Sequence, residues 1–312
     1  MKRKIVMTVA VILTVILLGG MIAGYFVVDS VYRKAFNYRC TTSVSDRYDV
    51  EFFPAMTYTR HTFPTRQGHL LTGYLYGSTD GAATKALVVF AHGLGAGGQI
   101  GYMPIFDYLV QSGYCVFAYD ATGNDESEGE AIGSLIQGYI DMDYAVTCAQ
   151  SLEETAGLPL VLMGYSWGAL SAGNTLNTHP EAVAVVTIAG WNRARDLMED
   201  SIRKKLGDTT SLVMPFISLY EFVTYGKYAS STAMKGFARS DCGAMIIHGE
   251  LDSTVPIEYG YDVYAAKYEN DPRFTFVRCS DRGHVNILPK NSTGFAGELL
   301  AQIVDFCDKW VG

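Results

Sequence analysis

The side chain best placed to do chemistry in this 312-residue sequence is Ser166, at the centre of residues 164–168, which read Gly-Tyr-Ser-Trp-Gly. An apolar run at 160–163 predicts a buried strand before this G-x-S-x-G pattern, and residues 169–172 begin a helical pattern after it. A serine on such a strand-to-helix turn stands above the sheet edge, where the start of the helix favours negative charge. The two glycines allow a strained turn and a close crossing in which a Cβ would clash. The pattern predicts that Ser166 is a nucleophile, provided that the rest of the chain supplies its partners.

A nucleophilic serine needs a base to take its proton and a carboxylate to orient that base. Beyond the helix predicted at 169–178, which His179 closes, histidine occurs at positions 248 and 284. His284 follows the last predicted strand, and Asp252 follows the strand before it. Because the carboxyl ends of parallel strands meet at one edge of a sheet, both side chains are expected beside the serine. Where a nucleophilic serine stands on such a strand-to-helix turn, called a nucleophile elbow, the acid and then the histidine typically follow it in the chain. Asp252 is therefore the predicted acid and His284 the predicted base.

Neighbouring residues leave alternatives open. Glu250 and Asp281 are rival carboxylates for the role of the acid. His248 ends a predicted strand and is expected to be structural, with its ring packed or hydrogen-bonded beneath the acid loop.

A glycine-rich loop at 92–98, His-Gly-Leu-Gly-Ala-Gly-Gly, follows the apolar run 86–91. A tetrahedral oxyanion needs backbone N–H donors. The amide of Trp167, directly after the serine, is one expected donor of an oxyanion hole, and the amide of Leu94 is the other. The loop lacks the Gly-Lys-Ser/Thr of a P-loop and the spacing G-x-G-x-x-G, which argues against a phosphate-binding loop of either kind.

Apolar runs and helical patterns alternate along the chain. Strands are predicted at 57–63, 70–76, 86–91, 115–119, 158–163, 183–188, 244–248 and 274–279, and helices at 102–112, 135–155, 169–178, 257–268 and 295–310. The first two strands alternate around a turn, as in an antiparallel hairpin, and the later apolar strands are typical of a sheet buried on both faces. The pattern predicts an α/β fold with a doubly wound, mostly parallel sheet and an N-terminal antiparallel hairpin.

The stretch at about 191–240 has no predicted strand. Helices are predicted at 195–205 and 215–228, the second rich in aromatic residues. Because an insertion at the carboxyl end of a strand covers the place where such sheets bind ligands, we interpret the stretch as a short helical lid. The alternative is a pair of ordinary helices that complete the core. The candidate substrate-binding side chains are Tyr165, Trp191, Phe216 and Tyr220.

The chain begins with a basic segment followed by an uncharged one. Residues 5–28 contain no charged side chain and follow three consecutive basic residues. At about 1.5 Å per residue this helix would reach about 36 Å, enough to cross a hydrocarbon layer of about 30 Å. We therefore expect a cytoplasmic flank at 1–4, a transmembrane signal anchor at 5–28, a juxtamembrane spacer at 29–55 that holds the domain off the bilayer, and an extracytoplasmic domain at 56–312. The alternative is a cleaved signal peptide and a secreted protein.

Charge and cysteine content restrict the partners. Without the three basic residues at the N-terminus, the chain has 21 Lys and Arg against 32 Asp and Glu, a net charge of about −11. Such an acidic domain is not expected to bind nucleic acid or an anionic membrane surface. The six cysteines have no C-x-x-C spacing and no histidines at metal-ligand spacing, so neither a metal nor another cofactor is expected. Outside the cytoplasm they could form up to three disulfides, whose pairing the spacing does not define.

Together the motifs resemble those of the α/β hydrolases, most closely the branch that contains monoacylglycerol lipases, bacterial carboxylesterases and serine aminopeptidases. The resemblance extends over about residues 57–311. It is carried, in the order typical of the family, by the segments 92–95, 164–168, 248–256 and 283–284. A further segment, 119–129, resembles the D-x-R-G-x-G-x-S-x-G loop of this branch. Thr122 replaces its arginine and Asp125 its second glycine, so the resemblance does not define the substrate.

The resemblance implies a serine hydrolase that forms an acyl-enzyme on Ser166. Carboxylic esters are favoured as substrates, and the aromatic lid and the membrane anchor suggest a hydrophobic or acyl substrate. A peptide substrate is less favoured because the sequence shows no obvious carboxylate cluster for a substrate amino group, although Glu221 in the lid is a candidate. A serine aminopeptidase-like peptidase or a thioesterase is therefore the alternative. A non-catalytic, membrane-tethered binding domain of the same fold is a second alternative.

Overall fold

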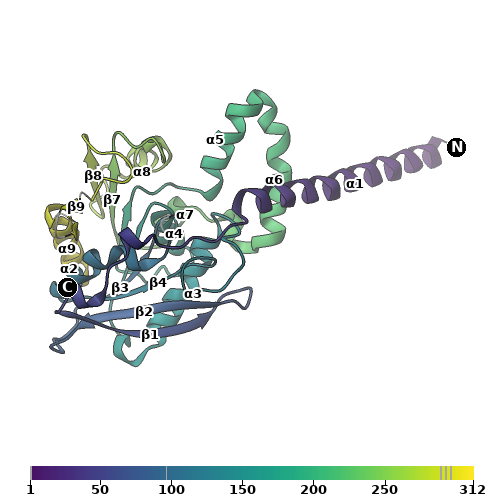
Figure 1. Ribbon diagram of the computed structural model, residues 1–312. Coiled ribbons are helices and arrows are strands. Elements are labelled where there is room, and N and C mark those ends of the chain that lie inside the picture. The colour runs from purple at the N-terminus through teal and green to yellow at the C-terminus, as the bar shows by residue number, and fades with distance from the viewer. Residues whose placement is uncertain (1, 96, 289, 292–293, 296) are drawn as a thin grey trace.

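Eight strands form one sheet in the computed structural model, which describes residues 2–95, 97–288, 290–291, 294–295 and 297–312 (Figure 1). The strand order is β1-β2-β4-β3-β5-β6-β7-β8. β1 and β2 form an antiparallel hairpin, β2 pairs antiparallel with β4, and the other pairs of this sheet are parallel. The predicted mostly parallel sheet with an N-terminal hairpin is confirmed.

The strands of this sheet are β1 (Met56–Pro64), β2 (Leu70–Ser78), β3 (Leu87–Ala91), β4 (Cys115–Tyr119), β5 (Leu160–Tyr165), β6 (Ala184–Ile188), β7 (Gly243–Gly249) and β8 (Phe274–Cys279). A separate short pair consists of β9 (Lys290–Asn291) and β10 (Gly294–Phe295). In β3 through β7 every residue is buried. This burial explains the continuous apolar runs of the sequence, because parallel strands are covered on both faces.

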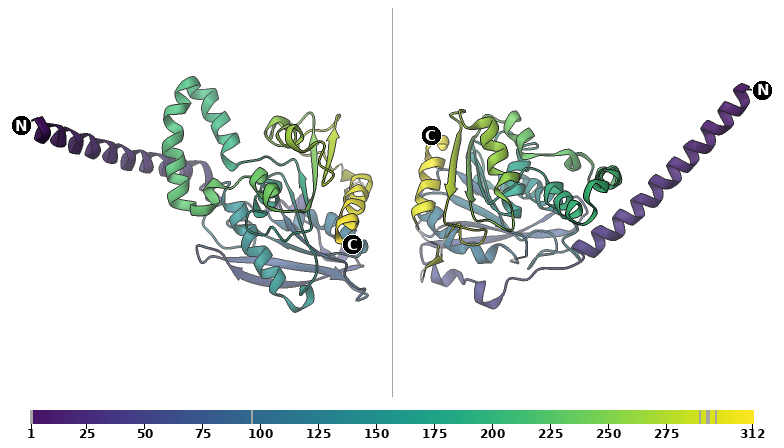
Figure 2. Two further views of the ribbon diagram at one scale, coloured as in Figure 1. Left: turned by 180° about the vertical axis from the view of Figure 1, so that it is seen from behind. Right: turned by 90° about the horizontal axis from the view of Figure 1, so that it is seen from above.

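Helices cover both faces of the sheet (Figures 1 and 2). α2 (Met103–Gln111) and α9 (Gly297–Val311) contribute to the core on one face. α3 (Gln137–Ser151), α4 (Trp167–Thr175) and α8 (Tyr261–Tyr268) contribute to the core on the other. The α/β order of the elements is as predicted.

The predicted helix 257–268 is interrupted. Residues Ile257–Tyr259 form a 3-10 turn, and α8 begins only after Gly260. A Cβ on Gly260 would lie 2.1 Å from the carbonyl oxygen of Gly190, so the chain needs a glycine where it passes the segment after β6. The other 3-10 turns are Val44–Asp46, Val50–Phe52, Gln99–Tyr102, Glu153–Thr155, Gly207–Thr209 and Gly226–Ser230.

Three helices lie between β6 and β7: α5 (Ala194–Leu206), α6 (Thr210–Tyr225) and α7 (Ala233–Arg239). α5 and α6 form a hairpin that rises from the body (Figure 1). The sequence places the start of the second helix at Pro215, whereas α6 begins at Thr210 and contains Pro215 in its interior. α7 was not predicted, and its start is capped by Thr232, whose hydroxyl accepts from the Lys235 amide at 3.0 Å.

α1 is one continuous helix, Lys2–Phe36, that projects from the body (Figures 1 and 2). It is long and apolar enough to cross a membrane, with a mean hydropathy of 2.8 over an 18-residue window, although a signal sequence passes the same test. Its C-terminal part packs on the domain, where Val28 and Tyr32 are buried. The segment that follows also stays on the domain, since Cys40 forms a parallel bridge with Asn124. The end of α1 and the start of the segment at 29–55 therefore pack on the domain.

All six cysteines are unpaired thiols, so the structure contains none of the disulfides that their number allows. Cys115 and Cys307 are buried, and burial raises the pKa of each thiol to about 12. Both therefore pack as small, unreactive apolar side chains.

Candidate active site

The segment around Ser166 forms a tight turn between β5 and α4. Ser166 has φ 55° and ψ −116°, a strained backbone conformation for a residue with a Cβ. A Cβ on Gly164 would lie 2.2 Å from the carbonyl oxygen of Gly168. A Cβ on Gly168 would lie 1.9 Å from the carbonyl oxygen of Ala91 at the end of β3. The glycines on either side of the serine therefore permit the close crossing that the sequence predicts.

Replacing Gly168 with alanine is expected to lower the free energy of unfolding by at least about 3 kcal/mol, because the new methyl group meets fixed backbone. Urea denaturation followed by circular dichroism measures the change. Gly77→Ala in β2 is the matched control, since nothing lies within 4 Å of a Cβ there. It is expected to change stability by less than about 1 kcal/mol. Equal losses in the two variants would contradict the close crossing.

The structure brings Ser166, His284 and Asp252 together in one chain of hydrogen bonds. The His284 Nε2 lies 2.8 Å from the Ser166 Oγ, and the His284 Nδ1 lies 2.7 Å from the Asp252 Oδ2. The serine stands after β5, the carboxylate after β7 and the histidine after β8. Three loops at the same edge of the sheet therefore supply a hydroxyl, an imidazole and a carboxylate in the order needed for proton transfer.

Asp252 is held as an oriented anion. Its Oδ1 accepts hydrogen bonds from the amides of Thr254 at 2.9 Å and Val255 at 2.8 Å. Burial opposes ionisation, but the hydrogen bonds from His248, His284 and the Val255 amide outweigh it, so the pKa of Asp252 lies below its usual value. The carboxylate is thus ready to orient His284 and to stabilise it when it is protonated.

The structure also places His248 and the two rival carboxylates, Glu250 and Asp281. His248 is fully buried beneath the acid loop, where its Nε2 donates to the Val255 carbonyl at 2.9 Å and lies 3.3 Å from the Asp252 Oδ2, in keeping with its expected structural role. Glu250 faces Arg278 at 3.4 Å, and Asp281 is largely exposed, with its nearest ion-pair partner at 3.8 Å. Neither carboxylate is the one that contacts His284.

The two amides expected to form an oxyanion hole flank the serine. Trp167 is the first residue of α4, so its N–H has no acceptor within the helix. Its indole Nε1 donates to the Leu135 carbonyl at 2.8 Å, which fixes this end of α4. Leu94 belongs to the glycine-rich loop, and a Cβ on the adjacent Gly93 would lie only 3.6 Å from the Cβ of Ser166. The loop therefore reaches the nucleophile, and the donor roles of Leu94 and Trp167 stay predictions.

His92 fixes the start of this loop, a role that the sequence did not reveal. It is buried, and burial lowers the pKa of its imidazole, so the ring is neutral. Its Nε2 accepts from the Ala121 amide at 3.0 Å, which leaves the Nδ1 to donate to the Gly93 carbonyl at 2.9 Å. The ring thus joins the glycine-rich loop to the loop after β4.

The two positions at which segment 119–129 departs from the family pattern have partners of their own. The Asp125 carboxylate accepts from the amide and hydroxyl of Thr42 at 2.7 and 2.6 Å, and from the Gly98 amide at 3.0 Å. The Thr122 amide and hydroxyl donate to Asp141 at 2.7 and 3.0 Å. Asp141 is buried, and burial raises its pKa to about 7. Asp125 therefore connects the glycine-rich loop to the segment after α1. Thr122 connects the loop after β4 to α3.

The four candidate substrate-binding residues do not share one site. The Tyr165 hydroxyl donates to the backbone carbonyl of His284, and its ring meets the imidazole edge-on at 6.1 Å, so this residue does border the hydrogen-bonded chain. Trp191 is buried in the segment after β6. Phe216 and Tyr220 face α1 instead, where Phe216 lies against Gly24 and Tyr220 packs on Tyr25 and Tyr32. Both side chains therefore contact α1, and their assignment to the substrate site stays a prediction.

Glu221 also has partners already. Its Oε2 pairs with Arg195 at 2.6 Å, and its Oε1 accepts from the Tyr32 hydroxyl at 2.8 Å. The side chain is buried. It therefore offers no free carboxylate to the amino group of a peptide substrate.

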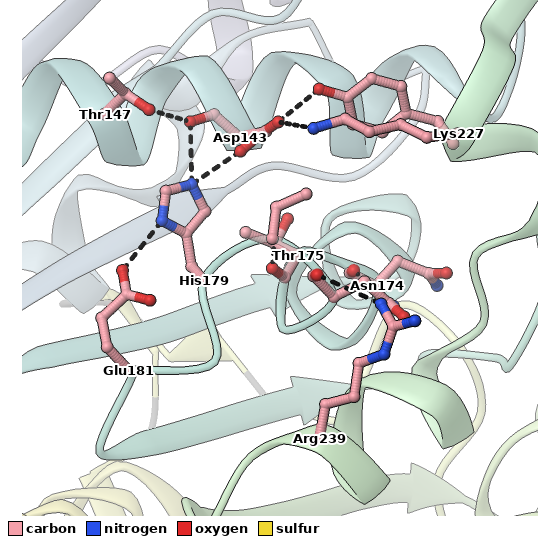
Figure 3. A network of polar contacts seen from close by, with 11 residues as sticks. Asp143, Thr147, Asn174, Thr175, His179, Glu181, Lys227 and Arg239 are labelled. Carbon is pink, nitrogen blue, oxygen red and sulfur yellow. Dashed lines mark hydrogen bonds and ion pairs between the residues drawn. The ribbon is translucent and has the colours of Figure 1, made fainter.

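A polar network around Asp143 in α3 holds the turn after α6 (Figure 3). Its Oδ1 lies 2.7 Å from the Nε2 of His179, and its Oδ2 accepts from the Tyr228 hydroxyl. The His179 Nδ1 lies 3.0 Å from Glu181. Burial opposes protonation of His179, but the hydrogen bonds to both carboxylates outweigh it and raise its pKa. The network joins the turn after α6 to α3 and to the segment after α4, so we assign it a structural role.

Among the residues that the structure describes, no three His, Cys, Asp or Glu side chains are grouped as metal ligands.

Comparison with known proteins identifies a matching family and solved structures of similar fold. Residues 82–276, well over half of the chain, match the family described as "Serine aminopeptidase, S33". None of the curated proteins matches the sequence. The similar solved structures include the esterase Pf2001 of Pyrococcus furiosus, with 19% identity and a TM-score of 0.64 over 88% of this chain and 98% of that one. Est1E from Butyrivibrio proteoclasticus, solved with ferulic acid bound, has 14% identity and a TM-score of 0.59 over 80% of this chain and 99% of that one. At these identities the structures establish the fold alone.

Proposed function

The chain belongs to the S33 serine aminopeptidase family of α/β hydrolases, and from this premise we propose that it is a membrane-anchored serine hydrolase that cleaves carboxylic esters through an acyl-enzyme on Ser166. The observation that carries the proposal is the hydrogen-bonded chain from the Ser166 Oγ through His284 to Asp252. Ser166 stands on a strained turn at the sheet edge, as is typical of an activated nucleophile in this fold.

In this mechanism His284 takes the proton of Ser166 as the Oγ attacks the ester carbonyl carbon. The amides of Leu94 and Trp167 stabilise the oxyanion that forms on the carbonyl oxygen. His284 then gives its proton to the departing alcohol, which leaves the acyl group on Ser166. Water attacks the acyl-enzyme in the same way and releases the acid. Asp252 keeps the imidazole in the tautomer that can accept the proton and stabilises the imidazolium.

The occupied carboxylate of Glu221 favours an ester over a peptide with a free amino terminus. Its two oxygens are bonded to Arg195 and Tyr32. Desolvating an unpaired substrate ammonium group would be costly. The family description leaves a serine aminopeptidase-like activity as the second candidate function, with thioester cleavage by the same residues as a variant of the first.

A panel of p-nitrophenyl esters and aminoacyl p-nitroanilides, assayed on the full chain, tests this choice. The esters are expected to give a kcat/KM at least about 100-fold higher, because an uncompensated ammonium costs several kcal/mol. Ser166→Ala is the control for background hydrolysis. Faster cleavage of the anilides would instead favour the aminopeptidase, and turnover of neither class by a well-folded chain would favour a binding domain.

We further propose that α1 anchors the chain, with a membrane-spanning segment at 5–28, a hydrolase domain at 56–312 and a lid at about 191–240. Basic residues before the apolar segment favour a cytoplasmic N-terminus and an extracytoplasmic domain. The packing of α1 supports retention over cleavage as a signal peptide. Removal of α1 would expose Phe216 and Tyr220, which lie against Gly24 and Tyr25.

A further inference from the structure

One face of α6 is apolar and exposed to solvent. Three of its side chains, Leu212, Phe222 and Val223, are 70%, 65% and 58% exposed. Pro215 is also exposed, and Phe216 and Leu219 are partly exposed. At about 100° per residue these six positions fall within an arc of about 120° on the helix. We call the set Leu212, Pro215, Phe216, Leu219, Phe222 and Val223 the α6 apolar face.

The α6 apolar face is unusual because the opposite side of the same helix is already buried. Ile217, Glu221 and Tyr225 face the domain. The apolar face is therefore not the core side of the helix. A contiguous exposed apolar surface on a folded domain typically marks a binding surface.

Contacts with α1 define the direction of this face. Phe216, on the edge of the face, lies against Gly24. Tyr220, further round the helix, packs on Tyr25 and Tyr32 and donates to Asp29 at 3.2 Å.

Glu221, on the far side of α6, accepts from the Tyr32 hydroxyl. Passing around α6 from the buried side to the apolar face therefore corresponds to moving along α1 toward its N-terminus. The α6 apolar face therefore points toward the uncharged segment 5–28. The polar contacts of α6 with Asp29 and Tyr32 lie nearer the C-terminal end of α1.

The level of α6 along α1 coincides with the end of the apolar segment. α6 contacts α1 at Gly24, and the first charged residue after the apolar segment is Asp29. Tyr25 stands between them, and Trp and Tyr are enriched at membrane interfaces. α6 also runs crosswise to α1 in Figure 1 and in the left view of Figure 2. A helix that crosses a membrane-spanning helix at this level would lie in the plane of the membrane surface.

From this geometry we propose that the α6 apolar face docks into the bilayer leaflet next to the catalytic domain, so that the lid is an interfacial membrane helix. The inference rests on the proposed anchoring by α1 and adds a second membrane contact made by the domain itself. Interfacial helices bury an apolar face by about 5–10 Å at the boundary of headgroups and acyl chains.

The contact is apolar rather than electrostatic. Arg203 and Lys204, near the turn between α5 and α6, pair with Glu199 at 2.7 Å and Asp200 at 2.7 Å. These ion pairs offset much of the local positive charge. Vesicles of zwitterionic phosphatidylcholine should therefore suffice, which is consistent with the acidic composition of the domain.

Quenching by brominated lipid tests the proposal on the full-length chain. Phe222→Trp places a reporter on the α6 apolar face, and Phe52→Trp is the matched control at another exposed phenylalanine, 72% exposed, on the segment before β1. Leu17→Trp, within the apolar segment of α1, reports whether α1 is inserted. Each variant is reconstituted in phosphatidylcholine vesicles with and without dibrominated acyl chains, and the fluorescence of the unsubstituted chain is subtracted.

The added fluorescence of Phe222→Trp is expected to fall by about twofold or more in brominated vesicles, as for Leu17→Trp, because the face lies at acyl-chain depth. That of Phe52→Trp should not change. If the fluorescence of Leu17→Trp were quenched and that of Phe222→Trp were not, the docking of α6 would be overturned and the proposed anchor would stand. Quenching of neither would overturn the anchor and the docking together. A Phe222→Trp reporter shielded from both brominated lipid and aqueous acrylamide would assign the face to a second copy of the chain and overturn the proposal. All three readouts are independent of hydrolysis.

Discussion

Ser166→Ala is expected to lower kcat for ester hydrolysis by about 10⁵-fold to 10⁶-fold, because it removes the atom that forms the acyl-enzyme. His284 and Asp252 would remain but would have no nucleophile to activate. A slow residual reaction is expected, since the amides at the serine still favour the oxyanion. Initial rates with a p-nitrophenyl ester, measured at saturating substrate, give the change in kcat.

Ser171→Ala is the matched control, since Ser171 lies in α4 and its hydroxyl donates only to the Trp167 carbonyl, at 2.8 Å. It is expected to keep kcat within about threefold of the unsubstituted chain. A Ser166→Ala variant that retained more than about one hundredth of the rate would contradict the role of Ser166.

Asp252→Asn is expected to lower kcat by about 10³-fold to 10⁴-fold with little change in KM. The carboxylate accepts from His284 at 2.7 Å and from two backbone amides. An amide in its place can present an N–H to the imidazole and favour the tautomer that cannot take the serine proton. The change is nearly isosteric, so the loss should appear in kcat while the circular dichroism spectrum is retained.

Asp281→Asn is the control for a carboxylate close to the same histidine in sequence. Asp281 is exposed and lies 3.8 Å from Arg282, its nearest ion-pair partner. Its substitution is expected to leave kcat within about twofold, because it removes only a weak surface pair. A larger loss of kcat in Asp281→Asn than in Asp252→Asn would contradict the role of Asp252 as the acid.

The fold could be predicted from the sequence because burial leaves a direct pattern in it. β3, β5 and β6 are covered on both faces and are therefore continuous apolar runs. The elbow glycines could also be anticipated, since Gly164 and Gly168 meet backbone atoms that exclude a side chain. The proximity of Ser166, Asp252 and His284 followed from the topology, because each stands after a parallel strand. Their catalytic roles stay predictions.

The contacts of α6 could not be predicted to the same degree, because this helix has two apolar sides. Spacing along the helix does not tell which neighbour each side meets. Phe216 and Tyr220 were therefore assigned to a substrate, whereas they pack on α1, almost two hundred positions earlier in the chain. Pro215 suggested a helix start, but the helix accommodates it in its interior.

The loop 119–129 could not be interpreted for a similar reason. Asp125 replaces a glycine of the family pattern, and its partners are Thr42, in the segment after α1, and Gly98, in the glycine-rich loop. No local signal connects these positions. A substitution that looks like the loss of a motif is, in the folded chain, a contact between the N-terminal segment and the loop beside the serine.

The most direct test is to treat the full chain with a fluorophosphonate probe and to locate the modification by mass spectrometry of the digested protein. The expected result is a single stoichiometric adduct on the peptide that contains Ser166, absent in Ser166→Ala and strongly slowed in Asp252→Asn. An adduct on another serine, or equal labelling of Ser166→Ala and the unsubstituted chain, would contradict a nucleophile at Ser166.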